Sequence, residues 1–219
     1  PEPEVLPFER LAVDAGTSNQ RLAALAALAS SVNPVYGKNR PHPLVIASIS
    51  AVLRQTLPPE AMMPGPSDTP DGNTWNVGQR VRLNHLLARW VDLGYRNEPI
   101  VQVPGTFGHR GGIIDVYPTH SELPFRIELW DDEIDTIRLF DPRTQRSVHT
   151  VDEVSIIPAR EQLPNLADRN RIDDIIRQMD FSLCNPQVRQ RIEDELSVLF
   201  DAPNVETLAF YNGLLNRTN

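Results

Sequence analysis

The sequence is almost without lysine and cysteine. Lys38 is the only lysine among 21 basic residues, and Cys184 is the only cysteine among 219 residues. A single cysteine excludes an internal disulfide and favours a reducing compartment. No apolar run approaches the roughly 20 residues that a membrane-spanning helix needs, and residues 1–10 lack the basic and apolar regions of a signal peptide. These absences predict a cytoplasmic protein with no membrane partner.

Basic charge is also scarce relative to acidic charge. The chain has 21 basic and 29 acidic residues, and its formal net charge is −8. Proteins that bind nucleic acid through its phosphates normally carry a basic excess. The preference for arginine suits planar, bidentate pairing with carboxylates at protein interfaces, although genome base composition or thermal adaptation explains it more simply. The charge balance therefore disfavours direct DNA binding.

The motifs of common catalytic sites are missing as well. A G-x-x-x-x-G-K-[ST] phosphate-binding loop requires a lysine, and Lys38 is followed by Asn39 and has no glycine five positions before it. No serine lies in a G-x-S-x-G elbow, and the histidines show no metal-binding spacing. Cys184 has no histidine near it in sequence, as a nucleophilic cysteine would need. We therefore predict a chain with no catalytic residues, no cofactor and no metal.

One acidic run looks like the end of a Walker B strand. Residues 127–133 read as an apolar strand followed by acids, which in a nucleotide hydrolase would hold Mg²⁺. Without the lysine loop no nucleotide phosphates would be bound opposite these acids, so a polar hairpin turn is the simpler interpretation. Carboxylate-only metal binding is the alternative, and it would use Asp131, Asp132, Glu133 and Asp135.

The first part of the chain alternates helical and strand patterns. Apolar residues recur at helical spacing up to residue 32, with Thr17, Ser18 or Asn19 as candidate caps. The apolar run at 44–49 (LVIASI) predicts a buried strand of a parallel sheet. A short helix is expected from Ser50 to the Pro58–Pro59 pair, and turn residues dominate 64–73.

Strands are concentrated in the middle of the chain. A helix from Val81 should end at Gly94, and strands are expected at 113–117, 125–130 and 136–140, with the strand-rich region running to about residue 157. Residues 168–200 should form two helices split at Asn185–Pro186. We predict a mixed α/β and α+β fold, in which an antiparallel sheet-plus-helix module (77–158) is inserted between 1–76, part of an α/β domain, and 159–219, its helical return segment.

The strand at 125–130 carries the clearest functional signal. Its period of two places Phe125, Ile127 and Leu129 on one face and Arg126, Glu128 and Trp130 on the other. An aromatic residue beside a planar cation on a solvated face is typical of a protein-binding patch. If a helix covered this second face, Trp130 would be a core residue instead. Arg110, beside the Gly111–Gly112 pair, either reaches the same face or lies at a flexible kink.

Two segments form a long ordered pattern: GTFGHRGGIIDVYP at 105–118 and LPFRIELWDDEIDTIRLFDPRTQRS at 123–147. The pattern resembles the domain shared by the bacterial repair helicase UvrB and the transcription-repair coupling factors (Mfd). The resemblance covers residues 5–165, including LPFERL (6–11), LVIASISAVLRQTLPP (44–59) and VDLGY (91–95). The coupling factors are the better match, because the phosphate-binding loop and the Y-G-L-G-S-P segment of UvrB are absent.

The resemblance implies a degenerate helicase-like α/β domain and a docking function for the inserted module. In this family the shared domain contacts UvrA, the damage-recognition ATPase. The motif carries that role to Arg110, Arg126 and Trp130, the last at a position where the coupling factors commonly have phenylalanine. The implied protein is a monomeric, non-catalytic adaptor region that brings UvrA to stalled transcription complexes in nucleotide excision repair. RNA polymerase, DNA and the ATP-dependent translocase motor would belong to other regions of the parent protein.

Two other functions are compatible with these residues. One is a fragment of a UvrB-type repair ATPase whose nucleotide site lies upstream of Pro1. The other is a degenerate DNA-binding module, which the charge of −8 disfavours.

Overall fold

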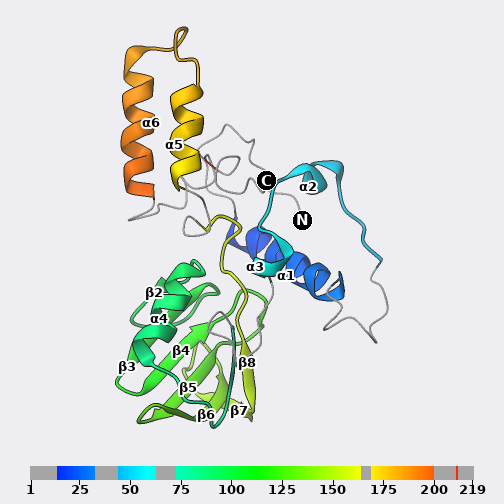
Figure 1. Cartoon of the computed structure of the whole chain (residues 1–219). Coiled ribbons are helices and arrows are strands. Elements are labelled where there is room, and N and C mark those ends of the chain that lie inside the picture. Colours follow the sequence, from blue (N-terminus) through cyan, green and yellow to red (C-terminus); the bar gives the residue numbers. More distant parts are fainter. Residues whose placement is uncertain (1–13, 33–43, 63–72, 164–168, 200–210, 212–219) are drawn as a thin grey trace.

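The computed structural model describes residues 14–32, 44–62, 73–163, 169–199 and 211. Figure 1 shows a sheet module flanked by the N-terminal helices and by a separate pair of helices from the C-terminal part. None of the described helices is both long and apolar enough to cross a membrane.

Helices and strands are mixed along the chain. The helices are α1 (Ala15–Val32), α2 (Ile49–Leu53), α3 (Pro59–Met62), α4 (Leu83–Asp92), α5 (Arg169–Gln178) and α6 (Pro186–Leu199). The strands are β1 (Thr74–Asn76), β2 (Arg96–Asn97), β3 (Thr106–Arg110), β4 (Ile113–Tyr117), β5 (Phe125–Trp130), β6 (Glu133–Phe140), β7 (Ser147–Val151) and β8 (Glu153–Ser155).

Six strands form the main sheet in the order β2-β3-β4-β5-β6-β7. All neighbours are antiparallel except β2, which runs parallel to β3. A second, two-stranded sheet pairs β1 with β8, with Thr74 opposite Ser155, and so joins the two ends of the module. The α+β class is confirmed. The helicase-like character of the flanking segments and the division of the chain at 77 and 158 stay predictions.

One face of the main sheet is covered by α4 and the β1–β8 pair. Trp90 of α4 is fully buried against the sheet and makes edge-on contacts with Trp75 and Phe107, at ring-centroid distances of 5.8 and 5.7 Å. Such edge-to-face pairs add to the stabilisation from apolar burial. The sheet contributes residues of every second position to this core: Ile114, Val116, Ile127 and Ile137. The predicted alternation of β5 is confirmed, because Ile127 is buried and its neighbours Arg126 and Glu128 face the other way.

A bulge in β6 adjusts which residues reach the core. Glu128 pairs with Thr136 but Leu129 pairs with Ile134, which leaves Asp135 without a partner on β5. The extra residue returns Ile134 to the covered face, where it is fully buried three positions from Ile137. This spacing of three hides part of β6 from a period-two sequence analysis.

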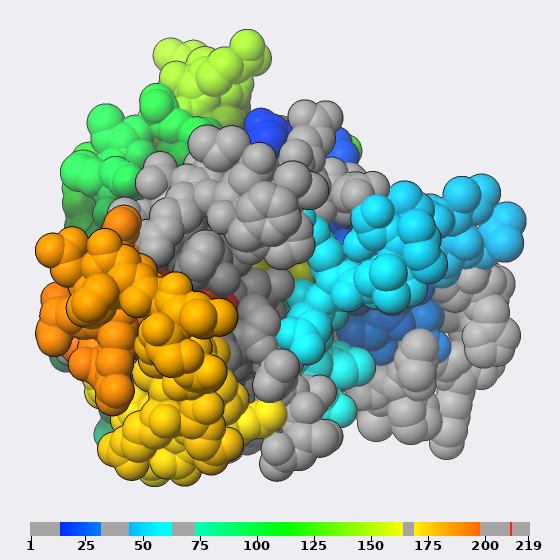
Figure 2. All heavy atoms as spheres, turned by 90° about the horizontal axis from the view of Figure 1, so that it is seen from above, coloured from blue at the N-terminus to red at the C-terminus, as the bar shows by residue number. Residues whose placement is uncertain are grey.

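The expectation of a buried parallel strand at 44–49 is wrong. Residues 44–48 belong to no helix or strand, α2 begins at Ile49, and the Leu44 side chain is 90% exposed. Figure 2 shows this segment (cyan) at the surface of the molecule. A strand that is apolar on both faces needs other elements to cover both faces, whereas the side chains of Leu44, Val45 and Ile46 are exposed.

The start of α1 also differs from the prediction. The helix begins at Ala15, and the Thr17 N–H donates to Asp14 Oδ2 at 2.8 Å, so Asp14 is the cap rather than Thr17, Ser18 or Asn19. Leu22 of α1 packs in a second apolar cluster with Met62 of α3 and with Leu163, which follows the sheet module. The helix therefore lies where the chain leaves the sheet.

The predicted split of the C-terminal helices is confirmed. Pro186 is the first residue of α6, and the Asn185 side chain accepts a hydrogen bond from the Gln187 N–H at 3.0 Å. In α5, Ile172 and Ile176 are buried, whereas Met179, expected on the same apolar face, is partly exposed.

Gly108 on β3 allows the chain after β2 to pass close to the sheet. A Cβ atom at this position would lie 2.3 Å from the backbone oxygen of Glu98, so a side chain would force the two backbones apart. We expect Gly108→Ala to lower the free energy of unfolding by about 3 kcal/mol, the upper part of the usual range for overpacking. Urea unfolding of the purified chain measures this.

The matched control for that variant is Gly78→Ala. Gly78 has a φ of 84° and nothing within 4 Å of a built Cβ, so only backbone strain opposes the change. That strain amounts to about 1 kcal/mol. Equal losses for the two variants would contradict the steric role of Gly108.

Tyr95 ties the start of β2 to the chain that leaves the sheet. Its buried hydroxyl donates to the Ile157 carbonyl at 2.9 Å, and burial raises the pKa of Tyr95 well above its ordinary value of 10.0. The folded state therefore needs the neutral phenol, and stability should fall as pH rises above 10.0, where the unfolded chain loses the proton.

The variant Tyr95→Phe tests this linkage. At neutral pH it should be less stable by about 1 kcal/mol, because the Ile157 carbonyl loses its donor. Above pH 10.0 the difference should shrink, because phenylalanine has no proton to lose. A difference in unfolding free energy that stays constant across this range would contradict the assignment.

Candidate protein-binding surface on the sheet face opposite α4

The sheet face opposite α4 carries two rows of side chains that run across the strands. Residues that pair directly on neighbouring strands share a face, so the ladder register defines each row. The first row is Arg110, Ile113, Glu128 and Thr136, and the second is Gly108, Asp115, Arg126 and Arg138. Trp130 follows Glu128 by two residues on β5 and therefore lies on this face, beyond the first row. We call this set of residues the open face.

Arg126 is held firmly within the open face. Its Nε and Nη2 atoms donate to the two carboxylate oxygens of Asp115 at 2.7 and 2.8 Å, a bidentate ion pair. The guanidinium carbon lies 4.7 Å from the centre of the Phe140 ring, and the Arg126 side chain is only 19% exposed. The hydrogen bonds to Asp115 raise the pKa of Arg126 above its ordinary value. The guanidinium group is therefore always charged, and the ion pair fixes its orientation.

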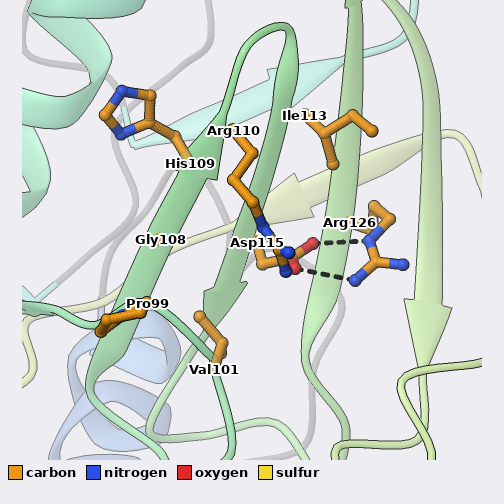
Figure 3. Close-up of a pocket in the computed structure, with 8 residues that line it drawn as sticks. All are labelled: Pro99, Val101, Gly108, His109, Arg110, Ile113, Asp115 and Arg126. Carbon is orange, nitrogen blue, oxygen red and sulfur yellow. Dashed lines mark hydrogen bonds and ion pairs between the residues drawn. The ribbon is translucent and has the colours of Figure 1, made fainter.

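A pocket of about 270 Å³ opens between this ion pair and the end of β3. Its lining residues, drawn in Figure 3, are Pro99, Val101, Gly108, His109, Arg110, Ile113, Asp115 and Arg126. Gly108 lets residues 98–101 approach, because a side chain there would strike the Glu98 backbone oxygen. Val101 is buried and forms the wall on that side. The pocket thus has an apolar wall and a charged floor.

Arg110 is the exposed cation of the pocket. Figure 3 shows its side chain extending along the pocket toward Asp115. Arg110 is exposed, and no carboxylate in the described part of the chain pairs with it. The β3–β4 turn that follows has glycine at 111, where φ is 59°, a conformation that glycine adopts without strain, and the hairpin brings Arg110 opposite Ile113. A cation in this position is available to an incoming anion.

Trp130 is the most exposed aromatic feature of the open face. Its side chain is 81% exposed at the end of β5, so it is not a core residue. The turn that follows is the predicted polar hairpin, with Asp131 at a φ of 58° and β6 antiparallel to β5. Arg80 approaches Asp132 at 3.9 Å across solvent. In the described segments, no group of three or more His, Cys, Asp or Glu side chains is placed to hold a metal ion.

The three residues proposed from sequence lie on one face of the sheet but differ in their location and in their contacts within the chain. Arg110 and Arg126 line the same pocket, whereas Trp130 lies outside it. Arg126 is paired within the chain, and Arg110 and Trp130 are free to contact another molecule. Their role in binding a partner stays a prediction.

Sequence analysis missed the residues that hold Arg126. Asp115 alternates with the buried Ile114 and Val116, and this pattern places it on the open face. An acid inside an apolar strand needs a cationic partner, and Arg126 is the arginine of the next strand, so the pair was accessible to such an argument. Gln145, which also contacts Arg126, gave no signal, because its position depends on the conformation of the β6–β7 turn.

Comparison with known proteins identifies the module. Residues 74–161 match the family described as the UvrB interaction domain. The chain is 33% identical over 191 residues to the transcription-repair-coupling factor of Myxococcus xanthus, which covers 87% of the chain and 15% of the relative. It is 40% identical over 119 residues to that of Bacillus subtilis strain 168, covering 54% of the chain and 10% of the relative.

A third similar protein is the transcription-repair-coupling factor of Mycobacterium bovis, 34% identical over 152 residues that cover 69% of the chain and 12% of the relative. The chain therefore spans a small fraction of the length of these relatives. Its matched segment includes the whole sheet and the open face. The chain belongs to the transcription-repair coupling factor family and corresponds to its N-terminal UvrB-like region.

Proposed function

We propose that this region is a non-catalytic adaptor that recruits the UvrA damage-recognition ATPase to stalled transcription complexes in nucleotide excision repair. The observation that carries the proposal is the exposure of Trp130 on the same sheet face as Arg110 and Arg126. Membership of the coupling-factor family and the match to the UvrB interaction domain support it.

Trp130 has the chemistry of an interface anchor. A tryptophan side chain buries a large apolar area when a partner covers it, and tryptophan and arginine are enriched among the residues that dominate binding energy. The partly exposed Ile113 lies on the same face and extends the apolar surface. A partner pocket that accepts the indole would therefore provide much of the affinity.

Arg110 provides the charged contact. It has no carboxylate partner among the described residues, and it lies at the rim of the pocket with one end in solvent. A carboxylate of UvrA would pair with it by charge-assisted hydrogen bonds. The neighbouring Asp115–Arg126 pair is internally neutral, so the pocket presents one net positive charge to the partner.

The groups on the open face suit binding rather than catalysis. They are three guanidinium groups, two carboxylates that are each already paired with one of them, a threonine hydroxyl, an indole and an isoleucine side chain. The proposal also includes the remaining properties that the family resemblance implies. The region acts as a monomer in the cytoplasm without a cofactor, and RNA polymerase, DNA and the translocase motor are engaged by other parts of the parent protein.

The replacement of Trp130 by alanine tests the anchor. We expect Trp130→Ala to weaken UvrA binding by about 2 kcal/mol or more, because truncation of a buried aromatic anchor has this effect. Isothermal titration of purified UvrA into the chain measures the change. The matched control is Leu183→Ala, which removes a 99% exposed apolar side chain from the turn between α5 and α6.

Arg110→Ala tests the charged contact in the same titration. We expect binding to weaken by about 1 kcal/mol or more and to become less sensitive to salt, while Arg143→Ala, which removes an exposed arginine from the β6–β7 turn, leaves affinity unchanged. If Trp130→Ala and Arg110→Ala both bind UvrA as tightly as the unaltered chain, the proposed surface is wrong.

Arg126→Ala should also weaken binding, but it leaves the Asp115 carboxylate without its partner and should destabilise the fold by about 3 kcal/mol.

A further inference from the structure

Nearly all hydrogen-bonding capacity of Arg126 is used inside the chain. A guanidinium group has five N–H donors. Two of them bind the Asp115 carboxylate, and two more reach Gln145, one to its backbone oxygen and one to its side-chain oxygen, each at 3.4 Å. A partner that docks on the open face can therefore receive at most one direct hydrogen bond from Arg126.

Gln145 connects Arg126 to the pocket wall. Its side-chain nitrogen donates to the backbone oxygens of Val101 at 3.2 Å and Pro142 at 2.8 Å, while its side-chain oxygen faces Arg126. Gln145 has a φ of 61°, a conformation that costs energy for a residue with a side chain and persists where surrounding contacts hold it. The Gln145 side chain therefore links the β6–β7 turn at Pro142, the pocket wall at Val101 and the pocket floor at Arg126.

We propose that Asp115 and Gln145 are positioning residues of the partner-binding surface. They hold the Arg126 guanidinium rigid at the floor of the pocket and leave Arg110 as the single cation that receives a carboxylate of the partner. The inference rests on the proposed binding of UvrA and assigns a division of labour within that site. Arg126 shapes the surface, and Arg110 and Trp130 make the contacts that determine affinity.

Positioning and simple charge attraction predict opposite effects of removing the Asp115 carboxylate. If the open face acts only as a positive patch for an acidic partner, loss of a nearby negative charge should strengthen binding and speed association. If Asp115 positions Arg126, its loss should weaken binding, because the partner must then order a mobile side chain. The sign of the change distinguishes the two.

The experiment compares Asp115→Asn with Asp135→Asn. Each variant removes one negative charge from the same sheet, but Asp135 is the exposed bulge residue of β6 and has no ion-pair partner in the described part of the chain. Surface plasmon resonance with immobilised UvrA gives both rate constants. We expect Asp115→Asn to weaken binding about tenfold, mainly through faster dissociation, and Asp135→Asn to bind at least as tightly as the unaltered chain.

The dissociation rate separates positioning from loss of folded protein. A variant that is only partly folded lowers the concentration of active chain but does not change the dissociation rate of complexes that form. An Asp115→Asn chain that dissociates as slowly as Asp135→Asn, or binds as tightly, overturns the inference. If Asp115→Asn does not fold, Gln145→Ala decides, with Gln187→Ala on the exposed face of α6 as its control. A folded Gln145→Ala chain should dissociate faster than that control, and equal dissociation rates overturn the inference.

Failure of this inference is distinguishable from failure of the proposed function. An unaltered chain that does not bind UvrA overturns both. An unaltered chain that binds UvrA and is weakened by Trp130→Ala, but whose Asp115→Asn variant behaves like Asp135→Asn, overturns only the positioning roles.

Discussion

The bidentate ion pair between Asp115 and Arg126 is the interaction on which the open face depends. It joins β4 to β5 at 2.7 and 2.8 Å, in a setting where the two side chains are mostly shielded from water. A buried ion pair is not by itself strong support for stability, since desolvation offsets much of the attraction. The pair matters here because it orients the Arg126 guanidinium, which lies over the Phe140 ring at the floor of the pocket. Both residues of the pair line the pocket.

The two faces of the sheet have different chemistry for a simple physical reason. The face toward α4 buries a continuous apolar cluster centred on Trp90, and that burial provides the main driving force for folding. The opposite face buries the smaller cluster of Val101, Tyr117 and Phe140, and the rest of it holds charged pairs and an exposed indole at Trp130. A largely antiparallel sheet can in this way provide the structural core on one face and the proposed docking surface on the other.

Local patterns predicted three of the six strands of the main sheet and the helix that covers it. Strands β4 and β5 and the part of β6 after its bulge follow from period-two alternation, and the end of α4 follows from Gly94, whose φ is 85°. The cap of α1 was misplaced locally, at Thr17, Ser18 or Asn19 instead of Asp14, whereas two other failures depend on distant parts of the chain. The run at 44–49 has the composition of a buried strand but no described strand to pair with. The hydrogen bonds between Gln145 and Arg126 depend on a turn 19 residues away in sequence, and no local residue pattern predicts them.

The central claim is that the open face, marked by Trp130, is where UvrA docks. Hydroxyl-radical footprinting with mass spectrometry tests it most directly, because tryptophan and methionine side chains react according to their exposure. Trp130 is 81% exposed, and the partly exposed Met179 lies beyond the end of α5 as an internal reference. On addition of UvrA we predict that oxidation of Trp130 falls sharply while oxidation of Met179 stays constant. Unchanged oxidation of Trp130 in a saturated complex would contradict the account.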